Sequence, residues 1–182
     1  MNQFAYVFEA SPLIFEALVE WDVKSKEYLR LFFSNEIYRT RRTQFGDCIS
    51  KVGYLIERVF EEPENFRGVK DVNDKLQAAA MVEDYFDCLY IDTLTNAPWN
   101  VIDNQPETVK GAATTLIEEL VRESLQLGYN GRLRVITIER AKPFYSRIGF
   151  IDDEDGSFVM ELTPQAAESF LDQQQRRREQ SN

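Results

Sequence analysis

In the second half of the chain, segments typical of β-strands are separated by a segment typical of an amphipathic helix. Residues 88–95 (CLYIDTLT) and 133–139 (LRVITIE) are rich in apolar and β-branched residues, as strands are. Between them, residues 112–127 repeat apolar side chains at helical spacing, and Gly128 is placed to end this helix. Strands that alternate with a helix in this way predict an α/β fold, with a mixed sheet flanked by helices.

The remaining segments of the second half extend the same sheet. Residues 76–83 form another predicted strand, and a hairpin through residues 84–87 is its simplest connection to 88–95. Residues 96–109 follow as a polar loop with two prolines. The sequence then predicts a short helix over 144–148 ended by Gly149, a hairpin of 150–152 with 157–162 around residues 153–156, and a last helix from Thr163-Pro164.

The first third is predicted to be mainly helical, after a possible opening strand at 4–8. Ser11-Pro12 is a good helix start, and Ser25 is a candidate N-cap of a second helix. A third helix is predicted over 49–61, whereas residues 61–74 look polar and irregular. The apolar face expected for the second helix consists of Leu29, Phe32, Phe33 and Ile37.

The length of 182 residues predicts one domain, because domains average about 150 residues. We place this domain at residues 1–172. The last ten residues, 173–182 (QQQRRREQSN), are wholly polar, and we expect a frayed helix end or a disordered tail there.

The charge balance restricts the partners. With 31 acidic and 21 basic residues the formal net charge is −10, which disfavours nucleic acid and anionic membranes but permits a cationic substrate. The N-terminus does not resemble a signal peptide, and no apolar run approaches the ~18 residues of a membrane span. We therefore expect a cytoplasmic protein.

The chain contains no histidine, which removes Ser-His and Cys-His nucleophile pairs and histidine metal sites. Cys48 and Cys88 match neither a zinc spacing nor a redox motif, so we expect two reduced, buried thiols and no metal site. The remaining chemistry must use carboxylates, tyrosine, lysine, backbone amides or a cofactor.

Small residues stand where the loop meets the predicted helix at 112–127. The first amides of a helix have no partners within it, and the helix dipole makes this end positive, so such a terminus binds phosphate. Small residues also begin helices for structural reasons alone, so this signal by itself is weak. The stretch is Lys110-Gly111-Ala112-Ala113-Thr114-Thr115.

A second stretch, residues 141–150, contains Ala141, Phe144, Tyr145, Gly149 and Phe150 in the spacing A-x-x-F-Y-x-x-x-G-F. Together with the first, it resembles the GNAT superfamily of acetyl-CoA-dependent N-acetyltransferases. The resemblance covers about residues 76–162, with Thr108 in place of the Arg or Gln that begins the family's cofactor loop. It implies a GNAT-like acyl-CoA N-acyltransferase fold, here with a helical N-terminal part.

The resemblance also implies how acetyl-CoA would bind. The pyrophosphate would rest on the backbone amides of the loop, and the pantetheine arm would lie between strands 88–95 and 133–139 as an added strand. Lys110 or Arg147 could meet a phosphate, although each could equally be a solvated cation. The implied loop contacts are Val109, Lys110, Gly111, Ala112, Ala113 and Thr114.

For catalysis, the resemblance implies that Tyr145 protonates the departing thiolate. An amide near Leu94 or Thr95 would stabilise the oxyanion, worth about 3 kcal/mol for comparable donors. With no histidine, the base that deprotonates the amine is expected to be a carboxylate, with Asp92 the first candidate. Glu83 and Glu139, at the ends of neighbouring strands, are the alternatives.

The leading hypothesis is thus a direct acetyl transfer from acetyl-CoA to a primary amine. Two alternatives stay open: a non-catalytic GNAT-like module that binds acyl-CoA as a sensor or scaffold, and an interaction domain unrelated to coenzyme A. The acceptor and the oligomeric state are open too, with a homodimer among the possibilities.

Overall fold

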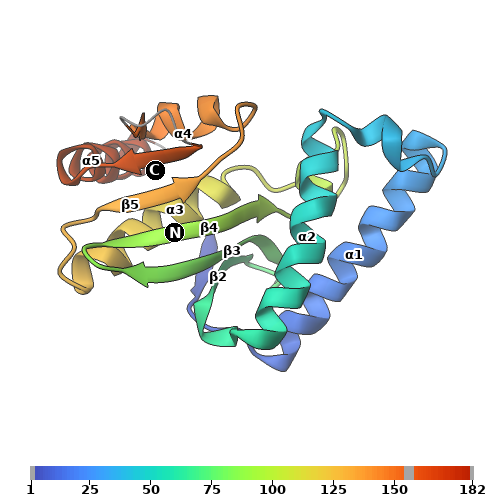
Figure 1. The fold of residues 1–182 in the computed structure, drawn as a ribbon, viewed down its shortest axis with the longest axis horizontal. Coiled ribbons are helices and arrows are strands. Elements are labelled where there is room, and N and C mark those ends of the chain that lie inside the picture. The colour runs from blue at the N-terminus through green and yellow to red at the C-terminus, as the bar shows by residue number, and fades with distance from the viewer. Residues whose placement is uncertain (1–2, 154–157, 181–182) are drawn as a thin grey trace. The chain divides into compact units, whose positions relative to one another are not determined.

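The computed structural model describes residues 3–153 and 158–180. Within them a seven-stranded mixed sheet has the order β1-β2-β3-β4-β5-β7-β6, which confirms the predicted α/β class (Figure 1). The strands are β1 Phe4–Val7, β2 Phe66–Asp71, β3 Leu76–Tyr85, β4 Cys88–Asn96, β5 Leu133–Ile136, β6 Ile151–Asp152 and β7 Val159–Leu162. The helices are α1 Pro12–Phe33, α2 Gln44–Glu61, α3 Ala112–Gln126, α4 Lys142–Ile148 and α5 Pro164–Gln180, with 3₁₀ turns at Ile37–Thr40, Pro63–Asn65 and Pro98–Asn100.

The chain divides into two compact units, which we describe separately. Unit 1 comprises residues 1–81 and 93–116, and unit 2 comprises residues 82–92 and 117–182. The strands β3 and β4 and the helix α3 each pass from one unit into the other. The expectation of one domain over 1–172 stays a prediction.

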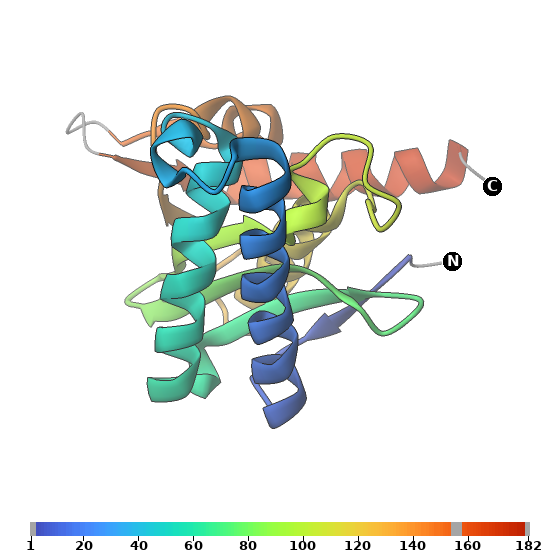
Figure 2. The same cartoon turned by 90° about the vertical axis from the view of Figure 1, so that its right-hand side faces the viewer.

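In unit 1, α1 and α2 run side by side in opposite directions (Figure 2). The prediction of two helices between Pro12 and Ile37 was wrong, because α1 continues to Phe33 and Ser25 is buried inside it rather than capping a new helix. Phe32 and Ile37, expected on a buried face, are 52% and 55% exposed. The buried stripe of α1 has helical spacing throughout: Ile14, Leu18, Trp21, Ser25 and Tyr28.

The helix α2 begins five residues before the predicted start at Ile49. Thr43 is its N-cap, since the side-chain oxygen accepts a hydrogen bond of 3.0 Å from the amide of Gly46. Val52 and Val59 are buried as the spacing predicts, but Phe60 is 81% exposed.

The segment predicted to be irregular, residues 61–74, contains the strand β2. This strand pairs with β1 and with β3, antiparallel in both cases. The charged Arg67 interrupts the apolar pattern expected of a buried strand. It is nevertheless buried, and its Nη1 donates hydrogen bonds to the carbonyls of Phe8 (2.7 Å) and Glu64 (2.6 Å). A buried arginine satisfied by backbone carbonyls cannot be distinguished from a surface arginine in the sequence.

In unit 2, β4 pairs in parallel with β5 over Leu89–Ile91, as expected for two strands joined by the helix α3. β7 pairs antiparallel with both β5 and β6. The predicted strand 133–139 ends early, at Ile136. The turn predicted at 153–156 falls largely outside the described residues.

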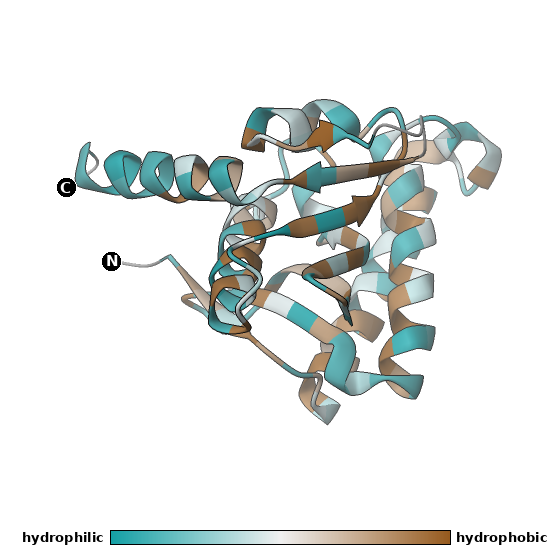
Figure 3. Cartoon of the chain, turned by 60° about the vertical axis from the view of Figure 1, so that its left-hand side comes forward, coloured by the Kyte–Doolittle hydropathy of each residue, from teal (hydrophilic) through white to brown (hydrophobic). Residues whose placement is uncertain are grey.

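The last helix, α5, extends to Gln180, so the segment 173–182, expected to be a frayed helix end or a disordered tail, is helical over its described part. Its C-terminal half is strongly hydrophilic (Figure 3). Glu118 of α3 is buried and accepts a hydrogen bond from Arg178 of α5. This ion pair links the polar end of α5 to α3.

None of the helices in residues 3–153 and 158–180 is both long enough and apolar enough to cross a membrane.

Candidate active site

In unit 1, hydrogen bonds of the Asn100 side chain hold the loop before α3 in place. The side-chain oxygen of Asn100 accepts a hydrogen bond of 2.8 Å from the Val109 amide, and its Nδ2 donates to Gln77 Oε1 at 2.9 Å. Thr108 donates from its hydroxyl to the Trp99 carbonyl at 2.7 Å. The Val109 amide is therefore already used, which corrects its expected role as a phosphate ligand.

Beyond Val109 the loop opens toward solvent. Lys110 and Gly111 are exposed, while Ala112 and Ala113, which begin α3, are buried. Gly111 has φ +90°, and a Cβ built on it would meet no atom within 4 Å. The backbone conformation needs glycine, and the open space beside it admits a ligand close to the main chain. The other five residues expected to hold a phosphate stay candidates for that site: Lys110, Gly111, Ala112, Ala113 and Thr114.

The end of β4, also in unit 1, carries the two residues expected to supply the oxyanion amide, Leu94 and Thr95. Both are 6% exposed. The Leu94 carbonyl accepts a hydrogen bond of 2.9 Å from Nζ of Lys51 in α2. One turn earlier on the same helix, the Cys48 thiol contacts the Asn96 carbonyl at 3.5 Å.

Sequence reasoning missed Lys51. Burial lowers the pKa of its ammonium group, while the nearby Asp47 and Cys48 act in the opposite direction. The one signal in the sequence is its place three residues after Cys48 and four before Leu55, on the buried side of α2. That signal is weak, because a long lysine stem covers apolar surface on many helices.

In unit 2, α4 holds Tyr145 in a nearly closed environment. The ring is 2% exposed and lies edge-on to Phe144 and Phe150, with centroid separations of 5.0 Å and 5.3 Å. Gly149 ends this helix at φ +117°, which turns the chain so that Phe150 returns to the tyrosine ring. Burial raises the pKa of Tyr145 above its usual range, so the phenol keeps its proton.

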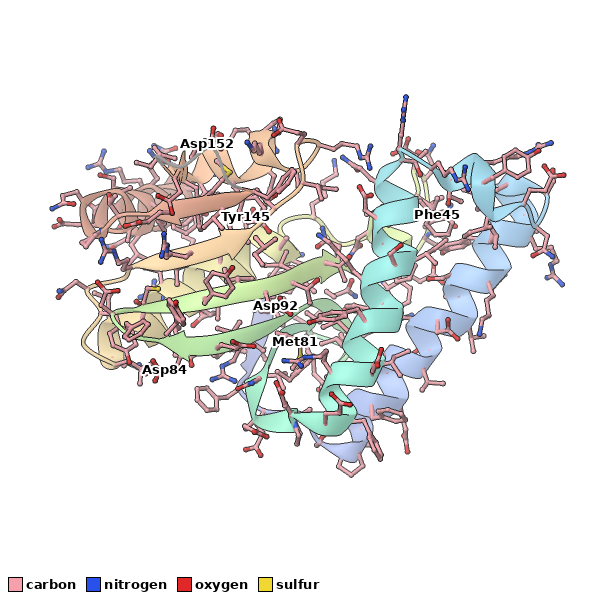
Figure 4. All side chains as sticks on the ribbon, viewed as in Figure 1. Phe45, Met81, Asp84, Asp92, Tyr145 and Asp152 are labelled. Carbon is pink, nitrogen blue, oxygen red and sulfur yellow. The ribbon has the colours of Figure 1, made fainter. Side chains whose placement is uncertain are left out.

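Two further predicted residues belong to unit 2. Asp92 lies half-buried on β4, and Figure 4 labels it together with Tyr145. Burial, and then the charge of Asp92, raise the pKa of Tyr90. Arg147 is exposed in the last turn of α4.

Glu139, an alternative base, lies beyond the end of β5 and forms an ion pair of 2.9 Å with Lys142. Glu83, the other alternative, is half-buried on β3. Among the described residues, no group of three or more Cys, Asp or Glu side chains could hold a metal ion.

The fold has counterparts among solved structures. The PaiA N-acetyltransferase of Thermoplasma acidophilum, solved in complex with coenzyme A, is similar with a TM-score of 0.55 and 19% sequence identity, over 87% of this chain and 97% of that one. The chain has the GNAT fold. An acetyltransferase of the GNAT family from Staphylococcus aureus Mu50 is similar with a TM-score of 0.52 and 13% identity, over 87% and 97% of the two chains. No protein-family model matches the sequence, and no curated protein does.

The shared fold confirms the fold that the resemblance at residues 76–162 implies, and the similarity covers 87% of the chain, well beyond that stretch. The structure places Leu94, Thr95 and residues 110–114 in unit 1, and Asp92, Tyr145 and Arg147 in unit 2.

Proposed function

We propose that this chain is an acetyl-CoA-dependent N-acetyltransferase that transfers the acetyl group directly from the thioester to a primary amine. Tyr145 carries the proposal. Its buried phenol lies in the complete motif of residues 141–150, and it holds its proton at neutral pH because burial raises its pKa. A phenol so placed is suited to give its proton to a departing alkyl thiolate.

Acetyl-CoA, when bound, supplies the activated acetyl thioester. The residues present suit such a ligand: Gly111 leaves open space at the start of α3, and the first amides of this helix form a positive terminus. Lys110 and Arg147 are exposed cations available to its phosphates. The bound coenzyme A of the Thermoplasma protein, whose fold is similar, supports the same choice.

The attack on the thioester requires a neutral amine and a donor for the developing oxyanion. We assign the donor to the backbone amide of Leu94 or Thr95, at the buried end of β4. Asp92 is the carboxylate proposed from the sequence to accept the proton of the amine. A cationic acceptor fits the net charge of −10, and a cytoplasmic location fits the composition.

The test is the release of free thiol from acetyl-CoA over a panel of primary amines, compared between the wild-type protein and Tyr145→Phe. We expect amine-dependent release by the wild-type protein and a loss of about 100-fold in the variant, with coenzyme A binding retained. If no amine raises turnover while coenzyme A still binds, the chain is an acyl-CoA-binding module instead. If coenzyme A at 100 times a micromolar Kd fails to stabilise the fold by about 2.7 kcal/mol, both proposals are wrong.

A further inference from the structure

Lys51 lies where the loss of hydration makes an ammonium group energetically unfavourable. It lies on the side of α2 that faces the core of unit 1, beside Cys48 (1% exposed), Val52 (1%) and Leu55 (0%). Lysine is among the residues least often buried, because its ammonium group loses hydration there. Lys51 itself is half-buried, and its ammonium group makes a hydrogen bond within unit 1.

The partner of Lys51 is a backbone carbonyl and not a carboxylate. Its Nζ donates to the Leu94 oxygen at 2.9 Å, and Cys48 reaches the Asn96 oxygen at 3.5 Å. Carbonyls two residues apart on a strand point to the same edge. Two side chains of α2 therefore lie along the edge of β4 at Leu94 and Asn96, the stretch that holds the proposed oxyanion donor.

The charge of Lys51 is weakly compensated. Burial lowers its pKa, and the groups that oppose this effect are Asp47 and Cys48, both on α2. Cys48 is itself neutral near physiological pH, because burial raises its pKa to about 12. From β4, the group in contact with Lys51 is the uncharged Leu94 carbonyl. A lysine in this setting loses its proton more readily than a surface lysine.

We propose that Lys51, in place of the Asp92 carboxylate, is the general base of the transfer, a role that rests on the proposed acetyltransferase function. The neutral Nζ takes one proton from the ammonium form of the acceptor and becomes an ammonium itself. The freed amine attacks the thioester carbon, so that the new C–N bond forms and the C–S bond breaks. The sulfur leaves with the electron pair and is protonated by Tyr145, and the second proton of the amine nitrogen, lost as the amide forms, restores the Tyr145 phenol by way of water. Lys51 returns its proton to water before the next turnover.

Three variants distinguish this role from the others. Lys51→Met keeps the length of the side chain but removes the amine, Lys51→Arg keeps the charge and the donor to Leu94 but stays protonated, and Asp92→Asn removes the competing base. We expect both Lys51 variants to lose about 100-fold in kcat while coenzyme A affinity stays within about 3-fold. We also expect kcat/KM of the wild-type protein to rise with pH on the acidic side through the pKa of Lys51, and the variants to lose that dependence.

Activity recovered in Lys51→Arg would overturn the proposal, because a positive charge would then be sufficient. Loss of the acidic limb in Asp92→Asn instead of the Lys51 variants would also overturn it. Melting temperatures of all three variants check that they fold.

An independent measurement is the titration of Lys51 by NMR in protein labelled with ¹³C at lysine Cε, with Lys51→Arg used to assign the signal. An ordinary lysine pKa near 10.4 would contradict the proposal even if the enzyme is active. A further outcome is that the wild-type protein transfers no acetyl group although Lys51 titrates at a lower pH than surface lysines. In that case the proposed function and the role of Lys51 in it are wrong, while the lowered pKa of Lys51 is confirmed.

Discussion

Glu118 of α3 and Arg178 of α5, 60 residues apart in the sequence, form an ion pair in unit 2. The Glu118 side chain is 2% exposed and also accepts a hydrogen bond of 2.7 Å from Arg122 on its own helix. A buried carboxylate needs such partners, because its desolvation is costly without them. The pair connects the polar end of the chain to the helix that follows the proposed cofactor loop.

Replacing Glu118 with Gln should therefore destabilise the protein. We expect the free energy of unfolding to fall by about 2 kcal/mol, since two guanidinium groups lose a charged partner and both are partly exposed. Urea denaturation followed by circular dichroism measures this change. Glu168→Gln, an exposed carboxylate of α5, is the matched control and should change stability by less than about 0.5 kcal/mol. Equal stabilities of the two variants would contradict the role of the pair.

Tyr145→Phe should separate chemistry from binding. We expect kcat to fall about 100-fold with coenzyme A affinity unchanged, because the ring and its contacts with Phe144 and Phe150 remain. Burial raises the pKa of the phenol, so its loss of a proton should not limit kcat below pH ~10. The control is Tyr129→Phe, which removes a hydroxyl bonded to Asp84 and should leave kcat unchanged. Equal kcat values for the two variants would remove Tyr145 from the mechanism.

Asn100→Ala should loosen the cofactor loop. The variant loses the acceptor for the Val109 amide and the bonds to Gln77, so we expect a loss of about 1–2 kcal/mol in stability. We also expect coenzyme A to bind about 10-fold more weakly by calorimetry, equal to about 1.4 kcal/mol. Gln105→Ala, in the same loop, removes one exposed bond to Asp103 and should do neither. Unchanged coenzyme A affinity in a destabilised Asn100→Ala would show that the loop is not a cofactor site.

Both thiols should be unreactive in the folded protein. Burial raises the pKa of Cys48 to about 12 and also raises that of Cys88. The thiolate is the reactive form, and at pH 8 only about one Cys48 in 10⁴ is ionised. We expect Ellman's reagent to label neither cysteine at pH 8 until denaturant is added, and labelling to rise with pH. Rapid labelling of the native protein at pH 8 would be inconsistent with these buried positions.

The sequence predicted best where short-range patterns decide the structure. Helices α3 and α4 lie within two residues of their predicted bounds, because apolar spacing, Pro143 and Gly149 act locally. It failed where a polar residue is buried with a distant partner. Arg67 concealed β2, since its carbonyl partners include Phe8, 59 residues away. Ser25 suggested a helix start, but it is one of the buried residues in the middle of α1.

The candidate site also combines residues in short motifs, which the sequence reveals, with residues brought in by long-range contacts, which it does not. Tyr145 and the small residues at 110–114 belong to contiguous motifs, so the sequence alone could propose them. The hydrogen bond between Lys51 and Leu94 spans 43 positions, and only the three-dimensional packing of α2 beside β4 reveals it. Val109 was misassigned for the same reason, because nothing nearby in the sequence indicates that Asn100 occupies its amide.

The two tryptophans of the chain, Trp21 and Trp99, both lie in the core of unit 1, with ring centroids 6.3 Å apart and planes at 90°. Their fluorescence is therefore an intrinsic reporter of unit 1 alone, and a mutation or ligand in unit 2 alters it only if the two units are energetically coupled. Far-UV circular dichroism, which averages over all helices, responds to both. Coincident unfolding curves from the two signals would identify one cooperative transition, and separated curves would assign a free energy to each unit.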